Sequence, residues 1–143
     1  MRRRHIPRAL RRLVRDRAGN RCEYCRHLAR YASAPFVCEH VRPWVAGSGN
    51  TLSELAWACP ACNGHKYDKT YARDPLTGRL VPLFDPRRQF WSRHFAWNDD
   101  FLLILGRTPT GRATVEALRL NRLEVINLRK ALAAIGEHPP DGR

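Results

Sequence analysis

The alternation of apolar and polar positions in the first half of the chain predicts a helix, two short strands and a second helix, in that order. Apolar residues recur at helical spacing among the arginines between residues 7 and 18, so an amphipathic helix is expected there. Residues 36–41 and 55–58 are short apolar runs rich in strand-forming side chains, and each predicts a strand. A turn over residues 59–62 is expected to follow the second strand and to lead into a helix that runs to about residue 69.

The second half of the chain predicts a turn, extended segments and a terminal helix. Residues 74–79 contain Pro and Gly at turn positions, and residues 80–84 are expected to be extended. A further strand is predicted over residues 101–105. Pro139 and Pro140 are expected to stop a helix in which four apolar residues share one face, namely Val125, Leu128, Leu132 and Ile135.

The composition is that of a globular chain rather than a disordered one, because 43% of the residues are hydrophobic and 27% are charged. With 143 residues, the chain is predicted to form a single domain over residues 1–143 with a modest core. No apolar run reaches the roughly 20 residues that a membrane-spanning helix requires. No signal-type apolar segment follows the basic N-terminus, so we expect a cytoplasmic protein without a membrane partner.

The positive charge gathers near the N-terminus. The formal net charge is +13, and residues 1–30 hold eleven arginines against two acidic residues. Such a field attracts polyanions, and the planar guanidinium group suits phosphate. A solvated charged face is the plainer interpretation, but the clustering favours nucleic acid. The residues expected to contact it are Arg8, Arg11, Arg12, Arg15, Arg42 and Lys66.

The cysteines predict a metal site. Two C-x-x-C pairs, Cys22 with Cys25 and Cys59 with Cys62, are separated by 33 residues. Each tight turn can point two sulfurs at one ion, and two such turns complete a tetrahedron around zinc. With all four positions filled by protein, this zinc is expected to be structural. A redox dithiol would normally occur once, so the matched copies disfavour that alternative, and Cys38 is interpreted as a small core residue.

The cysteine pairs bracket the dipeptide Glu39-His40 at the end of the first predicted strand, and Asn63 is expected to open the helix after the second. Glu39 and Asn63 can offer oxygen ligands to a hard cation such as Mg²⁺, which leaves His40 beside the ion as a base. A base beside a divalent cation is what phosphodiester hydrolysis needs. Taken alone, His40 would more often be structural and Asn63 an ordinary helix N-cap, but their position inside the zinc frame favours catalysis.

These motifs resemble the HNH endonucleases of the ββα-metal fold. The similarity is to the branch that carries CxxC, Asp/Glu-His-x-x-Pro, a Gly-rich loop and CxxCN-x-x-K. This chain has Cys22-x-x-Cys25, Glu39-His40-x-x-Pro43, Gly47-Ser48-Gly49 and Cys59-x-x-Cys62-Asn63-x-x-Lys66. The resemblance implies an α+β fold: a ββα-metal core over residues 20–70, stapled by a four-cysteine zinc site, with an N-terminal basic helix, small β additions and a C-terminal helix. Residues 71–143 would be a family-specific extension packed on that core.

The resemblance also implies roles for the residues. His40 would be the general base, Glu39 and Asn63 would bind a catalytic Mg²⁺ or another divalent cation, and the four cysteines would bind structural zinc. The implied activity is endonucleolytic cleavage of DNA, with RNA kept open as a substrate. His65 is expected on the surface, with a position near the ion or the phosphate as the alternative. His27 is expected to have no chemical role, and no oligomeric state is predicted.

Two positions depart from the family pattern. Glu39 stands where many members have Asp, and Glu54 occupies the place of the middle Asn, for which Asn50 could substitute. These exchanges keep an alternative open, in which the chain is a zinc-stabilised nucleic-acid-binding module with a weak or inactive centre.

Overall fold

The computed structural model describes residues 5–43 and 50–140. The predicted glycine-containing loop at residues 47–49 lies outside the described residues. Among the described helices, none is long and apolar enough to cross a membrane.

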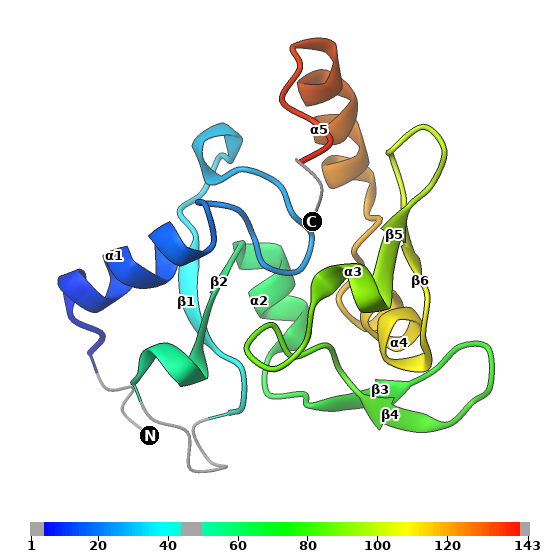
Figure 1. Cartoon of the computed structure of the whole chain (residues 1–143), viewed down its shortest axis with the longest axis horizontal. Helices are drawn as coiled ribbons and strands as arrows, with labels where there is room; N and C mark the ends of the chain where they lie inside the picture. Colours follow the sequence, from blue (N-terminus) through cyan, green and yellow to red (C-terminus); the bar gives the residue numbers. More distant parts are fainter. Residues whose placement is uncertain (1–4, 44–49, 141–143) are drawn as a thin grey trace.

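The first half of the chain forms the predicted helix–strand–strand–helix succession. Helix α1 (Arg8–Arg17) precedes strand β1 (Val37–His40), which pairs antiparallel with strand β2 (Leu55–Ala58). Helix α2 (Pro60–Lys66) follows β2 directly, and two short 3₁₀ turns, η1 (Ala29–Tyr31) and η3 (Leu52–Glu54), precede β1 and β2. These elements confirm the two strands and both helices (Figure 1).

Helix α2 differs from its prediction at both ends. It starts at Pro60, whose missing N–H costs nothing at a first helical position, and the Cys59 sulfur caps it by accepting from the Cys62 N–H. It ends at Lys66 instead of near residue 69, because Tyr67 turns into positive φ, at 50°. Asn63 therefore lies inside the helix, and the N-cap interpretation of this residue is wrong.

The second half of the chain adds two small hairpins and three helices. Its elements are β3 (Tyr71–Arg73), β4 (Leu80–Pro82), α3 (Trp91–His94), β5 (Phe95–Trp97), β6 (Ile104–Gly106), α4 (Pro109–Ala117) and α5 (Leu123–Ala134). Strand β3 pairs with β4 and β5 with β6, both antiparallel. The turn at 74–79 and the terminal helix are confirmed, and Ile135, which was expected on the buried face of that helix, is exposed just beyond its end.

The strand predicted over residues 101–105 begins later, at Ile104. The side chain of Asn98 accepts hydrogen bonds from the N–H groups of Leu102 and Leu103, which holds this part of the run in a turn. Helix α4 was not predicted, and it depends on a close approach: a Cβ at Gly111 would lie 1.9 Å from the His94 carbonyl oxygen. Only glycine allows α4 to pack this tightly against the preceding hairpin.

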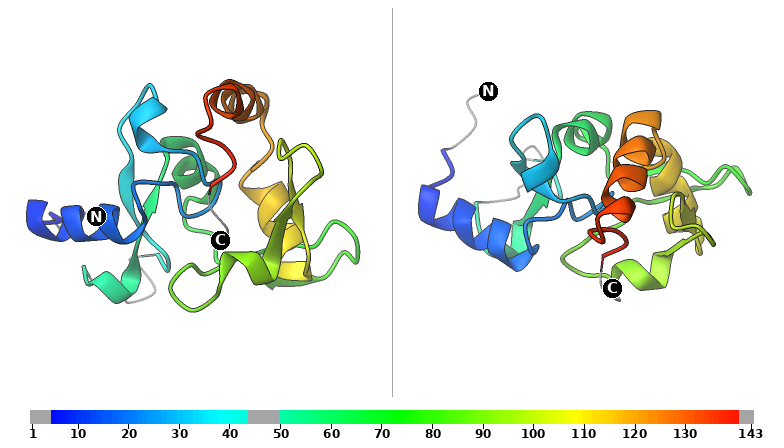
Figure 2. Two further views of the ribbon diagram at one scale, coloured as in Figure 1. Left: turned by 45° about the horizontal axis from the view of Figure 1, so that its top comes forward. Right: turned by 90° about the horizontal axis from the view of Figure 1, so that it is seen from above.

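The α+β prediction is confirmed by this mixture of small sheets and helices. The views of Figures 1 and 2 agree that α2 lies between the β1–β2 hairpin and the elements of the second half. One buried cluster joins the two halves, with Tyr24, Phe36 and Trp57 from the first and Phe84, Trp91 and Phe95 from the second. The Trp91 indole N–H also donates to the Tyr24 carbonyl oxygen at 3.0 Å.

Candidate zinc-stapled active site

The four cysteines meet at one point. The sulfur atoms of Cys22, Cys25, Cys59 and Cys62 all lie within 4.8 Å of one another, and all four residues are buried. The two turns repeat one geometry: the N–H of the second cysteine faces the sulfur of the first, at 3.5 Å in one turn and 3.4 Å in the other. Four converging thiols without an open position fit a structural zinc ion. The metal site predicted from the cysteine spacing is therefore present.

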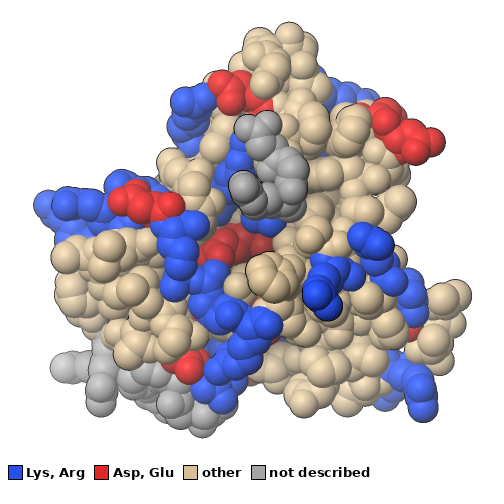
Figure 3. Space-filling view, viewed as in Figure 1, with Lys and Arg blue, Asp and Glu red and all other residues tan. Residues whose placement is uncertain are grey.

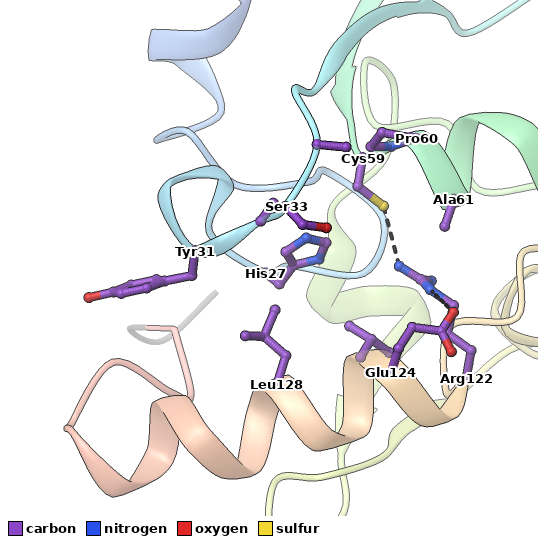
Figure 4. A pocket seen from close by; sticks show the side chains of 12 residues that line it. His27, Tyr31, Ser33, Cys59, Pro60, Ala61, Arg122, Glu124 and Leu128 are labelled. Atoms are coloured by element: carbon purple, nitrogen blue, oxygen red, sulfur yellow. Dashed lines mark hydrogen bonds and ion pairs between the residues drawn. The ribbon is translucent and has the colours of Figure 1, made fainter.

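Two further side chains contact the thiol cluster, and sequence reasoning assigned neither. Arg122, just before α5, reaches Cys59 Sγ at 3.3 Å (Figure 4). It also lies 3.7 Å from the sulfurs of Cys25 and Cys62. Burial alone would lower the pKa of Arg122, but the neighbouring sulfurs raise it, so the group stays charged. His27 Nδ1 lies 3.1 Å from Cys25 Sγ, a contact with the thiol cluster that the sequence did not predict. A guanidinium can offset part of the negative charge of a zinc tetrathiolate.

Glu39 faces the interior. Its carboxylate accepts a hydrogen bond from the Tyr24 hydroxyl at 2.7 Å and lies 2.5 Å from Lys66 Nζ, and the Glu39 and Lys66 side chains are each 2% exposed. Burial raises the pKa of Glu39, while Lys66 and Tyr24 oppose that shift. Burial and the Glu39 charge raise the pKa of Tyr24, which keeps its hydroxyl protonated and able to donate. The result is a buried ion pair with a phenol at one end.

Lys66 is not on the surface, contrary to the expectation that it contacts nucleic acid. Its ammonium also donates to the carbonyl oxygen of Val41 at 2.8 Å, so α2 is tied to the end of β1. This corrects the assignment of Lys66 as a phosphate ligand, because a buried ammonium held by a carboxylate and a carbonyl has no access to a nucleic-acid backbone.

His40 points to the other side of β1, as strand alternation requires. Its Nε2 lies 2.8 Å from Asn50 Oδ1, and Asn50 Nδ2 contacts the His5 carbonyl oxygen at 3.4 Å. Glu54, at the middle motif position, pairs instead with Arg42 at 2.9 Å. Asn50 is thus the amide that contacts the histidine.

The predicted oxygen ligands suit a hard cation by type but not by arrangement. Asn63 lies one turn before Lys66 on α2, on the side that approaches β1, and its amide makes no side-chain hydrogen bond to a described residue. Glu39, however, already has an ammonium on one oxygen and a phenol on the other. A cation at this carboxylate would therefore meet the positive charge of the Lys66 ammonium at short range.

The basic residues predicted to bind nucleic acid divide into two groups. Arg8 and Arg12 are exposed along α1, and Arg15 pairs with its neighbour Asp16 on the surface. Arg11 is half-buried: it donates to the Phe36 carbonyl oxygen at 2.7 Å and lies 5.2 Å from the centroid of the Trp57 ring. Arg11 therefore also has a structural role, since it fastens α1 to the hairpin.

Comparison with known proteins bears on the segment just described. A family model for the HNH endonuclease matches residues 22–69, which include all four cysteines together with β1, β2 and α2. No curated protein and no solved structure matches the chain. The family match indicates a nuclease or another function that involves nucleic acid. Residues 22–69 of this chain therefore match an HNH endonuclease domain, and the four-cysteine cluster fits the zinc-stapled branch of that family.

Proposed function

We propose that the chain is an endonuclease that hydrolyses phosphodiester bonds in DNA, with His40 activating the attacking water. The observation that carries the proposal is the His40–Asn50 hydrogen bond at the end of β1, inside the zinc-stapled frame. When Nε2 carries the proton toward Asn50, the lone pair of the neutral ring lies on Nδ1, which is the atom that would take a proton from water. Asn50 thereby selects the tautomer and orients the ring.

A nucleic acid is the substrate class that the charge supports. The chain carries +13, and Arg8 and Arg12 present their side chains along the exposed side of α1. Phosphate contacts of this kind give affinity without base recognition.

A divalent cation remains part of the proposal. It would stabilise the charge that develops on the transferred phosphate, and Glu39 and Asn63 are the residues that would hold it. Because Glu39 is paired with Lys66, we expect cation binding to compete with that ion pair, so activity should require more cation than an open site would.

Plasmid nicking with Mg²⁺ or Mn²⁺ tests the proposal. We expect nicking by the wild-type protein, and a loss of about 10²–10⁴-fold in His40→Ala, the range for a general base. His65→Ala serves as the matched control, because it removes another histidine of the same frame and should retain cleavage. Zinc content and DNA binding of each variant show that the frame is intact. Equal cleavage by His40→Ala and the wild type would contradict the assignment of the base.

The buried Glu39–Lys66 pair favours a second candidate function. If the Lys66 ammonium never leaves the Glu39 carboxylate, the charge of that carboxylate is permanently neutralised, and the chain is a zinc-stabilised nucleic-acid-binding module. In that case DNA binding would be measurable while nicking stays at background with every divalent cation tried.

A further inference from the structure

A cleft of about 420 Å³ opens where the two halves of the chain meet, and its wall is rich in arginine. It lies between the end of α1, η3 and the turn before α3, and Lys and Arg side chains run along this seam in Figure 3. The lining residues are Arg17, Ser53, Pro86, Arg87 and Arg88.

The positions of Arg17 and Arg87 are set by the fold. Arg17 donates to the carbonyl oxygens of Leu52 and Leu55, at 2.7 and 2.6 Å, which fixes its guanidinium against η3. Arg17 and Arg87 line the same cleft. Burial and the Arg87 guanidinium lower the pKa of Arg17, while Glu23 opposes that shift. Two cations held beside each other create a site that an anion stabilises.

The carboxylates in this region lie beneath the arginines. Glu23 pairs with Arg87, Asp85 with Arg88 at 2.8 Å, and Glu54 lies 3.8 Å from Arg88. The Glu23, Glu54 and Asp85 side chains are only 9%, 14% and 21% exposed, whereas Arg88 is 52% exposed. Arg88 is therefore the most exposed charged side chain of these pairs, whereas Arg87 is as buried as its partner Glu23.

Arg87 has an unused donor. Its side chain is 10% exposed, and its Nε, which is buried, has no hydrogen-bond partner among the described residues. A buried N–H without an acceptor is costly, and a shift of the Arg87 side chain would let this donor reach an anionic oxygen in the cleft.

Glu54 connects the wall of the cleft to the strand end that carries His40. Glu54, which contacts Arg88, also accepts the N–H of Val41 through its carbonyl oxygen at 3.0 Å. The next residue, Leu55, is the strand partner of His40. A chain of phosphates that crosses the cleft would thus run toward the end of β1.

We propose that this cleft binds the phosphodiester backbone of the nucleic-acid substrate through Arg17, Arg87 and Arg88, with Ser53 as a further donor. The inference rests on the proposed function, since it assigns where the substrate backbone lies relative to His40. Arg17 belongs to the basic first thirty residues that were expected to contact nucleic acid, although it was not named individually. Ser53, Arg87 and Arg88 were not expected to do so, because they come from other elements of the chain.

The experiment measures binding of a short fluorescent DNA duplex by anisotropy, in the His40→Ala background so that cleavage does not interfere. Arg88→Met should weaken binding several-fold at moderate salt and reduce the slope of log affinity against log salt by about 0.9, the value for one phosphate contact. Ser53→Glu should weaken binding further, because it adds a negative charge to the cleft.

Each variant has a matched control. Arg30→Met removes an arginine of another surface ion pair, with Glu137, and Ser33→Glu adds the same charge at an exposed serine away from this cleft. Both controls should leave the salt slope unchanged, and circular dichroism with zinc analysis checks folding. Equal effects of Arg88→Met and Arg30→Met, or no DNA binding at all, would overturn the inference.

The outcomes separate the two proposals. Loss of nicking in His40→Ala, combined with identical binding by Arg88→Met and Arg30→Met, would contradict the DNA-binding role of the cleft and support the nuclease proposal. DNA binding that depends on Arg88, without any nicking that depends on His40, would support the DNA-binding role of the cleft and contradict the nuclease proposal. Inorganic phosphate serves as competitor: displacement of DNA at low concentration would indicate a site for free phosphate instead of a backbone.

Discussion

Glu39 and Lys66 form an ion pair inside the protein, which is an expensive place for two charges. Removing both from water costs several kcal/mol each, and their attraction offsets this only if each partner stays in place. Tyr24 and the Val41 carbonyl oxygen supply the additional hydrogen bonds that such a pair needs. The pair therefore makes the end of β1 sensitive to single substitutions.

Lys66→Met should lower the free energy of unfolding by about 3–5 kcal/mol, because it leaves the Glu39 charge buried and unpaired. Urea denaturation measures this loss. Lys69→Met is the control, since Lys69 is an exposed lysine of the same region, and its effect should stay within about 0.5 kcal/mol.

The same variant tests the cation. If Glu39 is a ligand, Mn²⁺ should raise the melting temperature of Lys66→Met more than that of the wild type, because the ion takes over the role of the ammonium. An equal rise in both proteins would argue against a cation at this carboxylate.

At the scale of elements, Asp74 joins the β3–β4 turn to α4. Its carboxylate binds the Arg112 guanidinium through two contacts, at 2.9 and 2.8 Å, and also accepts from Leu76 N and the Thr77 hydroxyl. Arg112 and these donors hold the pKa of Asp74 well below its usual range.

This shift gives a pH prediction with a definite sign. A carboxylate with a lowered pKa stabilises the folded state above the unfolded-state value, ~3.9, and the stabilisation is lost as pH falls through the folded-state pKa. The melting temperature of Asp74→Asn should therefore lie below that of the wild type by a constant amount from pH 7 to about pH 5, and the gap should narrow at lower pH. The exposed Asp99→Asn should show no gap, and a gap that widens in acid would contradict the assignment.

At the scale of the molecule, the four-cysteine cluster is where the two halves meet. The thiol cluster belongs to the family-matched segment, whereas Arg122 comes from the last third of the chain and contacts three of its sulfurs. A tetrathiolate zinc is an anionic group, and burying it favours a nearby cation.

Arg122→Met should release zinc several-fold faster to a chromophoric chelator than the wild type does, and Arg122→Lys should be intermediate. Arg119→Met, a neighbouring exposed arginine, is the control. Since metal binding is coupled to folding, complete chelation should unfold both halves in one transition, observed by circular dichroism and tryptophan fluorescence. A purified protein without bound zinc, or a second half that stays folded after chelation, would contradict this account.

Several features were predictable because local spacing specifies them. Two residues between cysteines allow one turn and one direction for both sulfurs, and the helical repeat in residues 7–18 and the apolar runs at β1 and β2 identify those elements directly. Helix α4 was not predicted, because it depends on the close approach of Gly111 to His94. Strand β6 begins later than predicted, because Asn98 holds the preceding residues in a turn.

The candidate site also has some features that the sequence predicts and others that only the packing decides. His40 and Glu39 were identifiable because they are adjacent in the sequence and framed by cysteines, and strand alternation already requires them to face opposite sides. Three other features depended on how α2, α5 and the turn before α3 pack on the hairpin. These are the pairing of Lys66 with the Glu39 carboxylate, the contact of Arg122 with the thiols, and the cleft lined by Arg17, Arg87 and Arg88. Each of these contacts joins residues that are distant in the sequence. The sequence pattern does not show which of many possible partners a side chain meets, because the packing of the elements decides it.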